Sequence, residues 1–337
     1  NDSAINSYDM SVAIYSDNPV ALGNKGQTLL KNGNFKMGFD LYEWRHKTLK
    51  SMLKFNMTLP VWDGQKSAKR LLVYGEQGIG DQVLYGGLLP ELSAYPQGKV
   101  VALERRLIPL FKRSMPEMEF WDIEQLNDAS GFEEQIAIGS LPRLFRPNKD
   151  SFDRVKSPYL VADTARVQQL RQLVQRPGKR VCGISWSSKR EEIGQGKSIE
   201  LAQMLVPLAD AGLHFVNLQY GDTRKESEEL KREHGIELQD VAEVDNFGDI
   251  DGLAALIEAC DLVITTSNTT VHLAGALGKQ TMLLVPGGRS RLWYWGHDQL
   301  RSIWYPTVRI YGQERIGEWQ RPLAQIKADL ESEQCKL

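Results

Sequence analysis

The sequence predicts an α/β protein with two parallel-sheet domains that follow a short helical segment. From residue 70 onward, short apolar runs that suit buried strands alternate with helical patterns. Such alternation is typical of a parallel sheet covered by helices on both faces. The 337 residues also leave room for two domains of roughly 100–200 residues each. The predicted fold class is therefore two Rossmann-like domains that face a cleft.

Composition and charge are those of an ordinary globular protein. Hydrophobic residues make up 42% and charged residues 25% of the chain, which excludes a disordered or fibrous class. The net charge of -2 gives no global basic field, so we predict no nucleic-acid partner. No apolar run approaches the ~18 residues of a membrane span, and no signal peptide is visible, so we expect no membrane span and a cytoplasmic location. Cys182 and Cys260 lie in apolar runs and are expected in the core.

The pattern divides the chain into four segments. Residues 1–62 are predicted to be helical, and the string from Gly33 to Arg45 (GNFKMGFDLYEWR) resembles one hairpin of a tetratricopeptide repeat (TPR). Residues 63–162 and 163–305 are the two Rossmann-like domains. Residues 306–337 form a tail, whose helix we expect to return to the first domain by analogy with other two-domain proteins.

Strand and helix patterns can be placed in both domains. In the first domain we expect strands at 70–74, 99–103, 119–121 and 135–138, and helices at 81–92 and 105–114. In the second domain we expect strands at 180–186, 213–219, 261–265 and 280–285, and helices at 198–211, 223–234, 250–259 and 270–277.

A glycine-rich turn follows the first expected strand. Its glycines, at 75, 78 and 80, do not have the spacing of the dinucleotide fingerprint, so nicotinamide binding is not favoured. Asp81 would lie at the carboxyl edge of the sheet, where open α/β sheets bind ligands, and its carboxylate can deprotonate a hydroxyl group. Gly78 and Gly80 would form a loop beside the molecule that carries this hydroxyl group, the acceptor. The alternative role of Asp81 is a helix cap, for which Asp is favoured.

A second turn, rich in hydroxyl groups, follows the strand expected at 261–265. Backbone N–H groups, the helix dipole and short hydroxyls together favour an anion there, and a diphosphate is the expected guest. A Ser/Thr-rich cap is the plainer alternative, but it does not account for so many polar residues. His272 either contacts the phosphate or is a core histidine. The residues of this candidate site are Ser267, Asn268, Thr269, Thr270 and His272.

Further candidates follow the neighbouring strands of the second domain. Lys189 and Lys197 are suited to neutralising charge as a nucleotide departs, although solvation is the plain expectation for an exposed lysine. Gln219 and Tyr220 are candidates for a nucleobase or ribose contact. Because the sequence has no H-E-x-x-H or Walker pattern, we predict no metal and no bound cofactor.

These strings resemble a known group of enzymes. Gly80-Asp81-Gln82-Val83-Leu84 resembles the N-terminal motif of bacterial lipopolysaccharide heptosyltransferases, and the run from His272 to Gly278 resembles their donor-phosphate helix. Lys197 stands where that family has a lysine. The YEWR string and the DLVITTSNTTVHLAGALGK block are more similar to bacterial TPR-linked glycosyltransferases, and distantly to O-linked N-acetylglucosamine transferases.

The resemblance implies a GT-B fold, with a nucleotide-sugar donor as co-substrate in the second domain and an acceptor in the first. It implies that Asp81 is the base, that the anomeric carbon is inverted, and that Lys197, Thr269, Thr270 and His272 hold the donor phosphates. Many heptosyltransferases have an acid where this chain has Ser267-Asn268, so the sugar is not inferred to be heptose.

The predicted function is a metal-independent glycosyltransferase, and the repeat-like helices suggest a protein acceptor. Two alternatives stay open. One is a catalytically inactive scaffold that binds a protein partner, and the other is a sugar-nucleotide epimerase.

Overall fold

The computed structural model describes residues 2–48, 58–65, 69–92, 98–155, 157–188 and 194–334. The chain divides into two compact units: unit 1 is 1–156 with 292–298, and unit 2 is 157–291 with 299–337. The boundary expected after residue 162 therefore lies at 156. The segment 292–298, which we expected in the second domain, belongs to unit 1. Within the described ranges, no helix has both the length and the apolar character that a membrane crossing requires.

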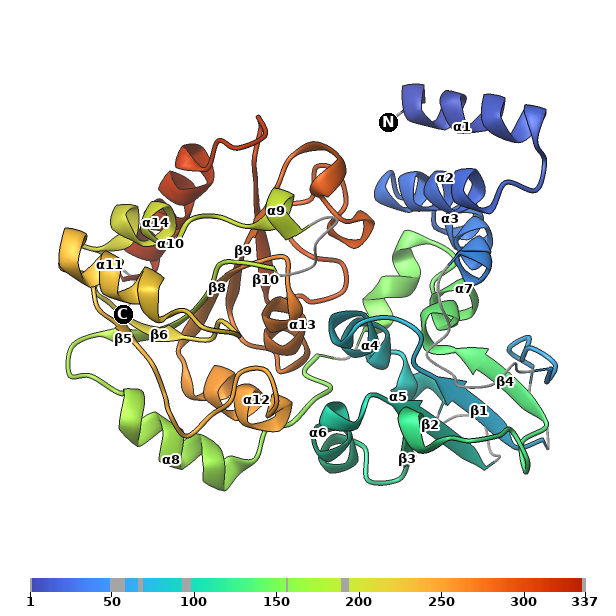
Figure 1. Cartoon of the computed structure of the whole chain (residues 1–337), viewed down its shortest axis with the longest axis horizontal. Coiled ribbons are helices and arrows are strands. Elements are labelled where there is room, and N and C mark those ends of the chain that lie inside the picture. Colours follow the sequence, from blue (N-terminus) through green and yellow to red (C-terminus); the bar gives the residue numbers. More distant parts are fainter. Residues whose placement is uncertain are drawn as a thin grey trace. The chain divides into compact units, whose positions relative to one another are not determined.

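Unit 1 begins with helices α1 (Asp2–Ile14), α2 (Pro19–Lys31) and α3 (Phe35–Tyr42), and α3 continues into the 3-10 helix η1 (Glu43–Lys47) (Figure 1). The side chain of Asn18 caps α2 by accepting from the backbone N–H groups of Val20 and Ala21. Two helices thus lie on either side of Gly33, as the sequence predicts. Their kinship with tetratricopeptide repeats stays a prediction.

The sheet of unit 1 is parallel and has the strand order β3-β2-β1-β4. The chain starts at β1, adds β2 and β3 on one side, and then adds β4 on the other. The direction of winding therefore reverses between β1 and β4, and such a switch point is where open α/β sheets bind ligands. The strands are β1 (Leu71–Tyr74), β2 (Lys99–Leu103), β3 (Glu119–Asp122) and β4 (Glu134–Ala137).

Four α-helices of unit 1 follow its strands: α4 (Ile79–Gly86), α5 (Leu89–Leu92), α6 (Ile108–Ser114) and α7 (Leu141–Phe145). The single helix expected at 81–92 is thus two helices. The interruption falls at Gly86 and Gly87, and glycine is a poor helix former. A Cβ atom on Gly86 would lie 2.7 Å from a ring carbon of Phe111, so the glycine allows α4 to pack closely on α6.

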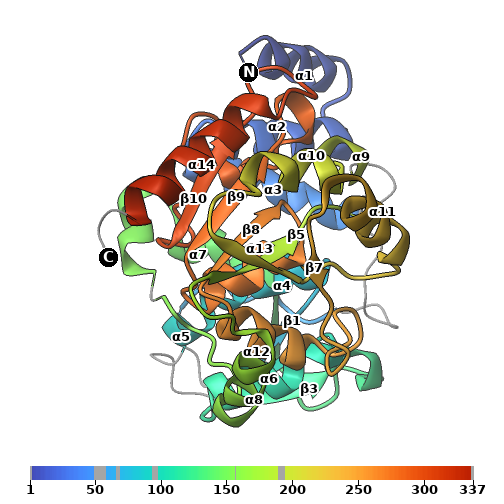
Figure 2. The ribbon, with the colours of Figure 1, turned by 90° about the vertical axis from the view of Figure 1, so that its left-hand side faces the viewer.

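Unit 2 also has a parallel sheet, with the order β10-β9-β8-β5-β6-β7 (Figure 2). Its winding reverses between β5 and β8, where Ser185 pairs with Thr265. The strands are β5 (Arg180–Ser185), β6 (Leu213–Asn217), β7 (Leu238–Gln239), β8 (Leu262–Thr266), β9 (Thr281–Val285) and β10 (Val308–Gly312). The helices are α8 (Thr164–Val174), α9 (Gly194–Lys197), α10 (Leu201–Leu205), α11 (Arg224–His234), α12 (Ile250–Ala259), α13 (Thr269–Ala276) and α14 (Gln320–Gln334).

The core of unit 2 explains two differences from the expected elements. Leu323, Ile326 and Leu330 of α14 belong to the same buried cluster as the strand residues of this unit. The helix that we expected to return to the first domain therefore packs in unit 2. The expected helix at 198–211 is α10 followed by the 3-10 helix η6 (Val206–Leu208), because Pro207 lacks the N–H group that an α-helix needs.

Candidate functional site

The switch point of unit 2 holds a network of buried polar side chains. Asn268 is the N-cap of α13, and its Oδ1 accepts from the backbone N–H of Thr270 at 3.0 Å. Its Nδ2 donates to Ser185 Oγ at 2.7 Å and to the carbonyl of Ser187 at 3.3 Å. One amide side chain therefore ties the first turn of α13 to the end of β5.

Gln219 shapes the chain that follows β5. Its Oε1 accepts from Ser185 Oγ at 3.0 Å and from the backbone N–H groups of Trp186 and Ser187 at 3.0 and 2.9 Å. The side chain is thus bonded to the protein itself. Its contact with a nucleobase or ribose stays a prediction.

Tyr220 follows Gln219 and has an aromatic neighbour. Its ring centroid lies 6.1 Å from that of Phe247, with an interplanar angle of 38°. Phe247 is 59% exposed, although large apolar rings are usually buried. The pair offers an accessible aromatic surface at the carboxyl end of β6, and the sequence analysis did not single out Phe247.

Lys197 and His272 are both buried in unit 2. Solvation, the plain expectation for an exposed lysine, therefore does not describe Lys197, which is only 4% exposed. Burial, followed by the positive charge of Lys197, lowers the pKa of His272 to about 3. The imidazole is accordingly neutral at physiological pH, and its Nδ1 lies 3.1 Å from the hydroxyl of Tyr305. Lys189 lies outside the described residues.

The hydroxyl-rich turn between β8 and α13 lies beside this network. Ser267 and Thr270 are buried, whereas Thr269 is half-buried at the first position of α13. Among the described residues, the buried Thr266 Oγ1 has no hydrogen-bond partner, and a buried hydroxyl without one is costly. The turn supplies a helix N-terminus and short hydroxyls, and the charge of the buried Lys197 acts on His272 in the helix that follows. This is the chemistry that binds an anion such as a phosphate.

The switch point of unit 1 holds Asp81. Gly78 is the N-cap of α4, and Asp81 follows in the first turn, half-buried. The alternative that Asp81 caps the helix is therefore wrong. Burial raises the pKa values of Tyr42 and Tyr85, and the negative charge of Asp81 raises both further. Gly80, which we expected in a loop, lies instead inside α4, next to Asp81.

A buried ionic cluster stands next to the glycine-rich turn and joins it to η1. The guanidinium of Arg45 donates to Glu76 through Nε at 3.1 Å and through Nη2 at 2.8 Å. It also donates to Glu43 Oε1 at 2.7 Å and to Ser140 Oγ at 2.8 Å. Burial opposes the charge on Arg45, but the carboxylates of Glu76 and Glu43 hold its pKa above the ordinary value.

Ser140, His46 and Glu76 form a serine–histidine–carboxylate series like that of a hydrolytic triad, but the serine is not activated as a nucleophile. His46 Nε2 lies 3.3 Å from Ser140 Oγ, and His46 Nδ1 lies 3.7 Å from Glu76 Oε2. Ser140 is 1% exposed, and its hydroxyl donates to Glu43 at 2.9 Å while it accepts from Arg45. A buried hydroxyl whose proton is directed to a carboxylate rather than to the histidine is not an activated nucleophile.

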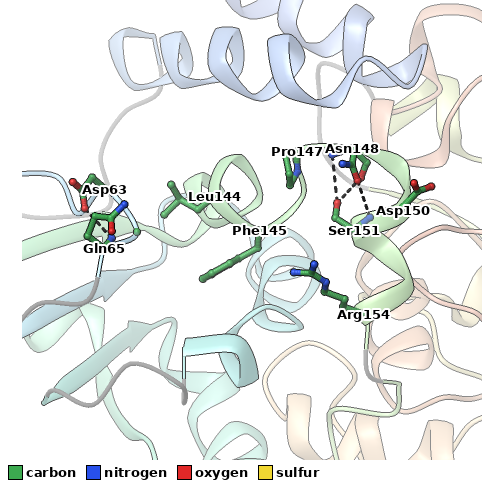
Figure 3. A pocket seen from close by; sticks show the side chains of 10 residues that line it. Asp63, Gln65, Leu144, Phe145, Pro147, Asn148, Asp150, Ser151 and Arg154 are labelled. Atoms are coloured by element: carbon green, nitrogen blue, oxygen red, sulfur yellow. Dashed lines mark hydrogen bonds between the residues drawn. The ribbon is translucent and has the colours of Figure 1, made fainter.

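Unit 1 also has a surface pocket of about 510 Å³ between the 58–65 segment, the end of α7 and the following 3-10 helix (Figure 3). Asn148 and Ser151 bond to each other there, and Ser151 N lies 3.0 Å from Asn148 Oδ1. The pocket contains none of the predicted site residues, and its charged residues Asp63, Asp150 and Arg154 are exposed.

Comparison with solved structures identifies the fold. The chain matches ADP-heptose lipopolysaccharide heptosyltransferase II of E. coli with a TM-score of 0.51 and 14% identity, over 79% of this chain and 99% of that one. It matches a family 9 glycosyl transferase of Veillonella parvula with a TM-score of 0.51 and 11% identity, over 80% and 96% of the two chains. The fold is that of the GT-B glycosyltransferases.

One curated relative resembles the sequence itself. The chain is 32% identical to Protein FlbA of Caulobacter vibrioides over an alignment of 323 residues, which covers 90% of this chain and 53% of FlbA. The chain thus spans about half the length of this relative. No protein-family model matches it.

Within the predicted anion site, the structure joins Asn268 to residues at the end of β5. Asn268 was recognisable because Asn at a strand-to-helix turn is a favoured cap. Its links to Ser185 and Ser187, 83 and 81 residues earlier, could not be read from local spacing. The same is true of Arg45, whose partners Glu76 and Ser140 lie 31 and 95 residues away.

Proposed function

We propose that the protein transfers a sugar from a nucleotide-sugar donor to a hydroxyl group of an acceptor, with the donor bound by unit 2. The observation that carries this proposal is the switch point of unit 2. There a capped helix N-terminus and buried hydroxyls come together, and the charge of the buried Lys197 acts on His272 of the same helix. A diphosphate satisfies these groups because it supplies both negative charge and acceptor oxygens. Tyr220 and Phe247 offer an aromatic surface for the base at the end of β6.

In this proposal Asp81 of unit 1 is the general base. A half-buried carboxylate at the carboxyl edge of a parallel sheet is suited to accept the proton of an acceptor hydroxyl. The deprotonated oxygen attacks the anomeric carbon, and the nucleoside diphosphate leaves with the bonding electron pair. A single displacement of this kind inverts the anomeric centre. In this proposal backbone amides, hydroxyls and Lys197 neutralise the phosphate charge, so the reaction needs no metal ion. We place the reaction in the cytoplasm and propose that the acceptor is a protein.

The first experiment is a thermal-shift panel of UDP, GDP, ADP, CMP and their common sugars. A ligand that binds only the folded protein stabilises it by about 2.7 kcal/mol at a hundredfold excess over Kd. We expect a clear shift from one nucleotide. Lys197→Met should weaken that nucleotide's binding by roughly 10- to 100-fold, the value of a hydrogen bond to a charged group.

Lys279→Met is the matched control because Lys279 is a largely buried lysine of the same unit, and it bonds to Glu258 instead. It should leave nucleotide binding unchanged. A flat response across the panel would contradict the donor site and favour an inactive scaffold.

The second experiment tests the base. Asp81→Asn should lower turnover by roughly 10²- to 10⁴-fold, the usual contribution of a general base, while the thermal shift by the nucleotide is retained. The anomeric configuration of the product, read by NMR, should be opposite to that of the donor. Equal turnover in the variant would remove the role assigned to Asp81, and altered sugar nucleotide released without acceptor would indicate an epimerase.

A further inference from the structure

The strongest unexplained feature of unit 1 is Arg45, a fully bonded arginine in a 3-10 helix outside the sheet. It is 4% exposed. Its Nε and Nη2 bind Glu76, Nη1 binds the carbonyl of Tyr42 at 3.2 Å and the carboxylate of Glu43, and Nη2 also binds Ser140. The planar fork of a guanidinium therefore has a partner for each of its nitrogens. Lysine, with one nitrogen, cannot reproduce this geometry.

One partner of Arg45, Glu76, belongs to the glycine-rich turn. Glu76 is the second residue after β1, and its side chain is 5% exposed. Gln77 comes next, and its Oε1 accepts from the hydroxyl of Tyr42 at 3.2 Å. The carbonyl of Gln77 in turn accepts from Gln82 Nε2 at 2.8 Å. Two successive residues of the turn are thus held by the α3–η1 segment.

The backbone at Gly139 also lies close to the turn. A Cβ atom on Gly139 would lie 2.3 Å from Glu76 Oε1, 3.1 Å from Gln77 Nε2 and 3.2 Å from Arg45 Nη2. Glycine at this position lets the chain after β4 contact the ionic cluster without a side chain between them. The side chains of Glu76 and Gln77 therefore lie close to the backbone at Gly139, and Glu76 also contacts the guanidinium.

We propose that Arg45 is a positioning residue: through Glu76 it holds the turn from Gly75 to Asp81, and thereby sets the place of the Asp81 carboxylate. The effect of Arg45 on catalysis rests on the proposed function. The restraint that Arg45 places on the turn does not depend on that function. The helical segment α3–η1 is then part of the catalytic apparatus of unit 1, in addition to any contact with a partner.

The variant that tests this is Arg45→Lys in the full chain, with Arg146→Lys as the matched control. Arg146 is also fully buried in unit 1 and pairs with a carboxylate, that of Glu91, but it bonds to no residue of the turn. Arg45→Lys should lower kcat by about 10²-fold, as expected for a misplaced reacting group. The Kd of the donor nucleotide should stay within about twofold of the wild-type value, and Arg146→Lys should change neither constant by more than about threefold.

A second measurement does not depend on activity. Hydrogen exchange, followed by mass spectrometry on the peptides that cover residues 75–86, should be at least about tenfold faster in Arg45→Lys than in Arg146→Lys. Equal exchange in the two variants would overturn the restraint.

The kinetic outcomes separate the two proposals. If Asp81→Asn abolishes turnover and Arg45→Lys leaves kcat at the level of Arg146→Lys, the positioning role falls while the proposed function stands. If Asp81→Asn retains full turnover, the base assignment falls, and faster exchange in Arg45→Lys would still support the restraint on the turn.

Discussion

His272 shows how far burial shifts the pKa of a single side chain. Its pKa lies at about 3, below the ordinary 6.5, because burial and then the charge of Lys197 disfavour the protonated form. Between these two values the unfolded chain binds more protons than the folded one. Stability therefore falls as the pH falls from about 6.5 toward 3, by at most about 1.4 kcal/mol per pH unit from this group.

His272→Gln should consequently reduce the dependence of the unfolding free energy on pH over this window. The measurement is urea denaturation at several pH values between about 4 and 6.5, compared with the wild type. His297→Gln is the control, because the side chain of His297 is 57% exposed. An unchanged slope in His272→Gln would contradict the buried, neutral imidazole.

At the scale of single residues, the sequence indicated candidates whose roles would depend on local position. Asn268 and His272 belong to one strand-to-helix turn, where cap preference and helix polarity act over a few residues. Arg45, Glu76 and Ser140 were not predicted, because an ion pair between distant segments leaves no periodic signal. Composition alone does not distinguish them from solvated charges.

At the scale of elements, the pairing of α2 with α3 depends on two glycines. A Cβ atom on Gly26 would lie 2.8 Å from the backbone nitrogen of Tyr42, and one on Gly38 would lie 2.7 Å from Leu30 Cγ. Real Cβ atoms do not approach so closely, so alanine at either position would push the helices apart.

Gly26→Ala should destabilise unit 1 by about 1–3 kcal/mol, the usual cost of overpacking. Gly23→Ala is the matched control, because Gly23 is in the same helix and a Cβ atom there would meet nothing within 4 Å. That substitution should stabilise the unit by about 0.5–1 kcal/mol, since glycine is a poor residue for a helix interior. The midpoints of thermal unfolding of the two variants should therefore shift in opposite directions. A shift in the same direction would contradict the close packing.

Elements of unit 2 were predicted closely where burial imposes a simple pattern. The expected helix at 250–259 and the expected strand at 280–285 agree with α12 and β9 within a residue. The strand was recognisable because strands of a parallel sheet that are buried on both faces are continuous apolar runs. Prediction was less accurate where a single residue interrupts a helix, as Pro207 does after α10. The short strand β7 was missed because two residues carry no period.

At the scale of the whole molecule, the segment 292–298 interrupts unit 2 and belongs to unit 1. Trp293 is 5% exposed, and its ring makes edge contacts with Phe39 and Tyr42, both at 5.7 Å between centroids. Prediction treated 163–305 as one domain because the alternation of strands and helices continues through it. An excursion of a few residues does not disturb that pattern.

Trp293→Ala should therefore weaken unit 1, although the residue follows most of unit 2 in the sequence. Loss of a buried tryptophan costs about 3–5 kcal/mol. Hydrogen exchange resolved by segment should show faster exchange in α2 and α3. Trp304→Ala, which removes a buried tryptophan of unit 2, should leave those helices unchanged. The opposite pattern would show that the segment does not stabilise unit 1.

The late position of Trp293 also has a consequence for the order in which the protein can form during synthesis. A ribosome that adds roughly 5–20 residues per second needs about ten seconds to proceed from the end of the first stretch of unit 1 to this tryptophan. During that interval Phe39 and Tyr42 lack the ring of Trp293, and most of unit 2 emerges first. Unit 1 is therefore completed only after most of unit 2 has been made, and a nascent chain halted before residue 293 would expose an apolar surface for chaperones to bind.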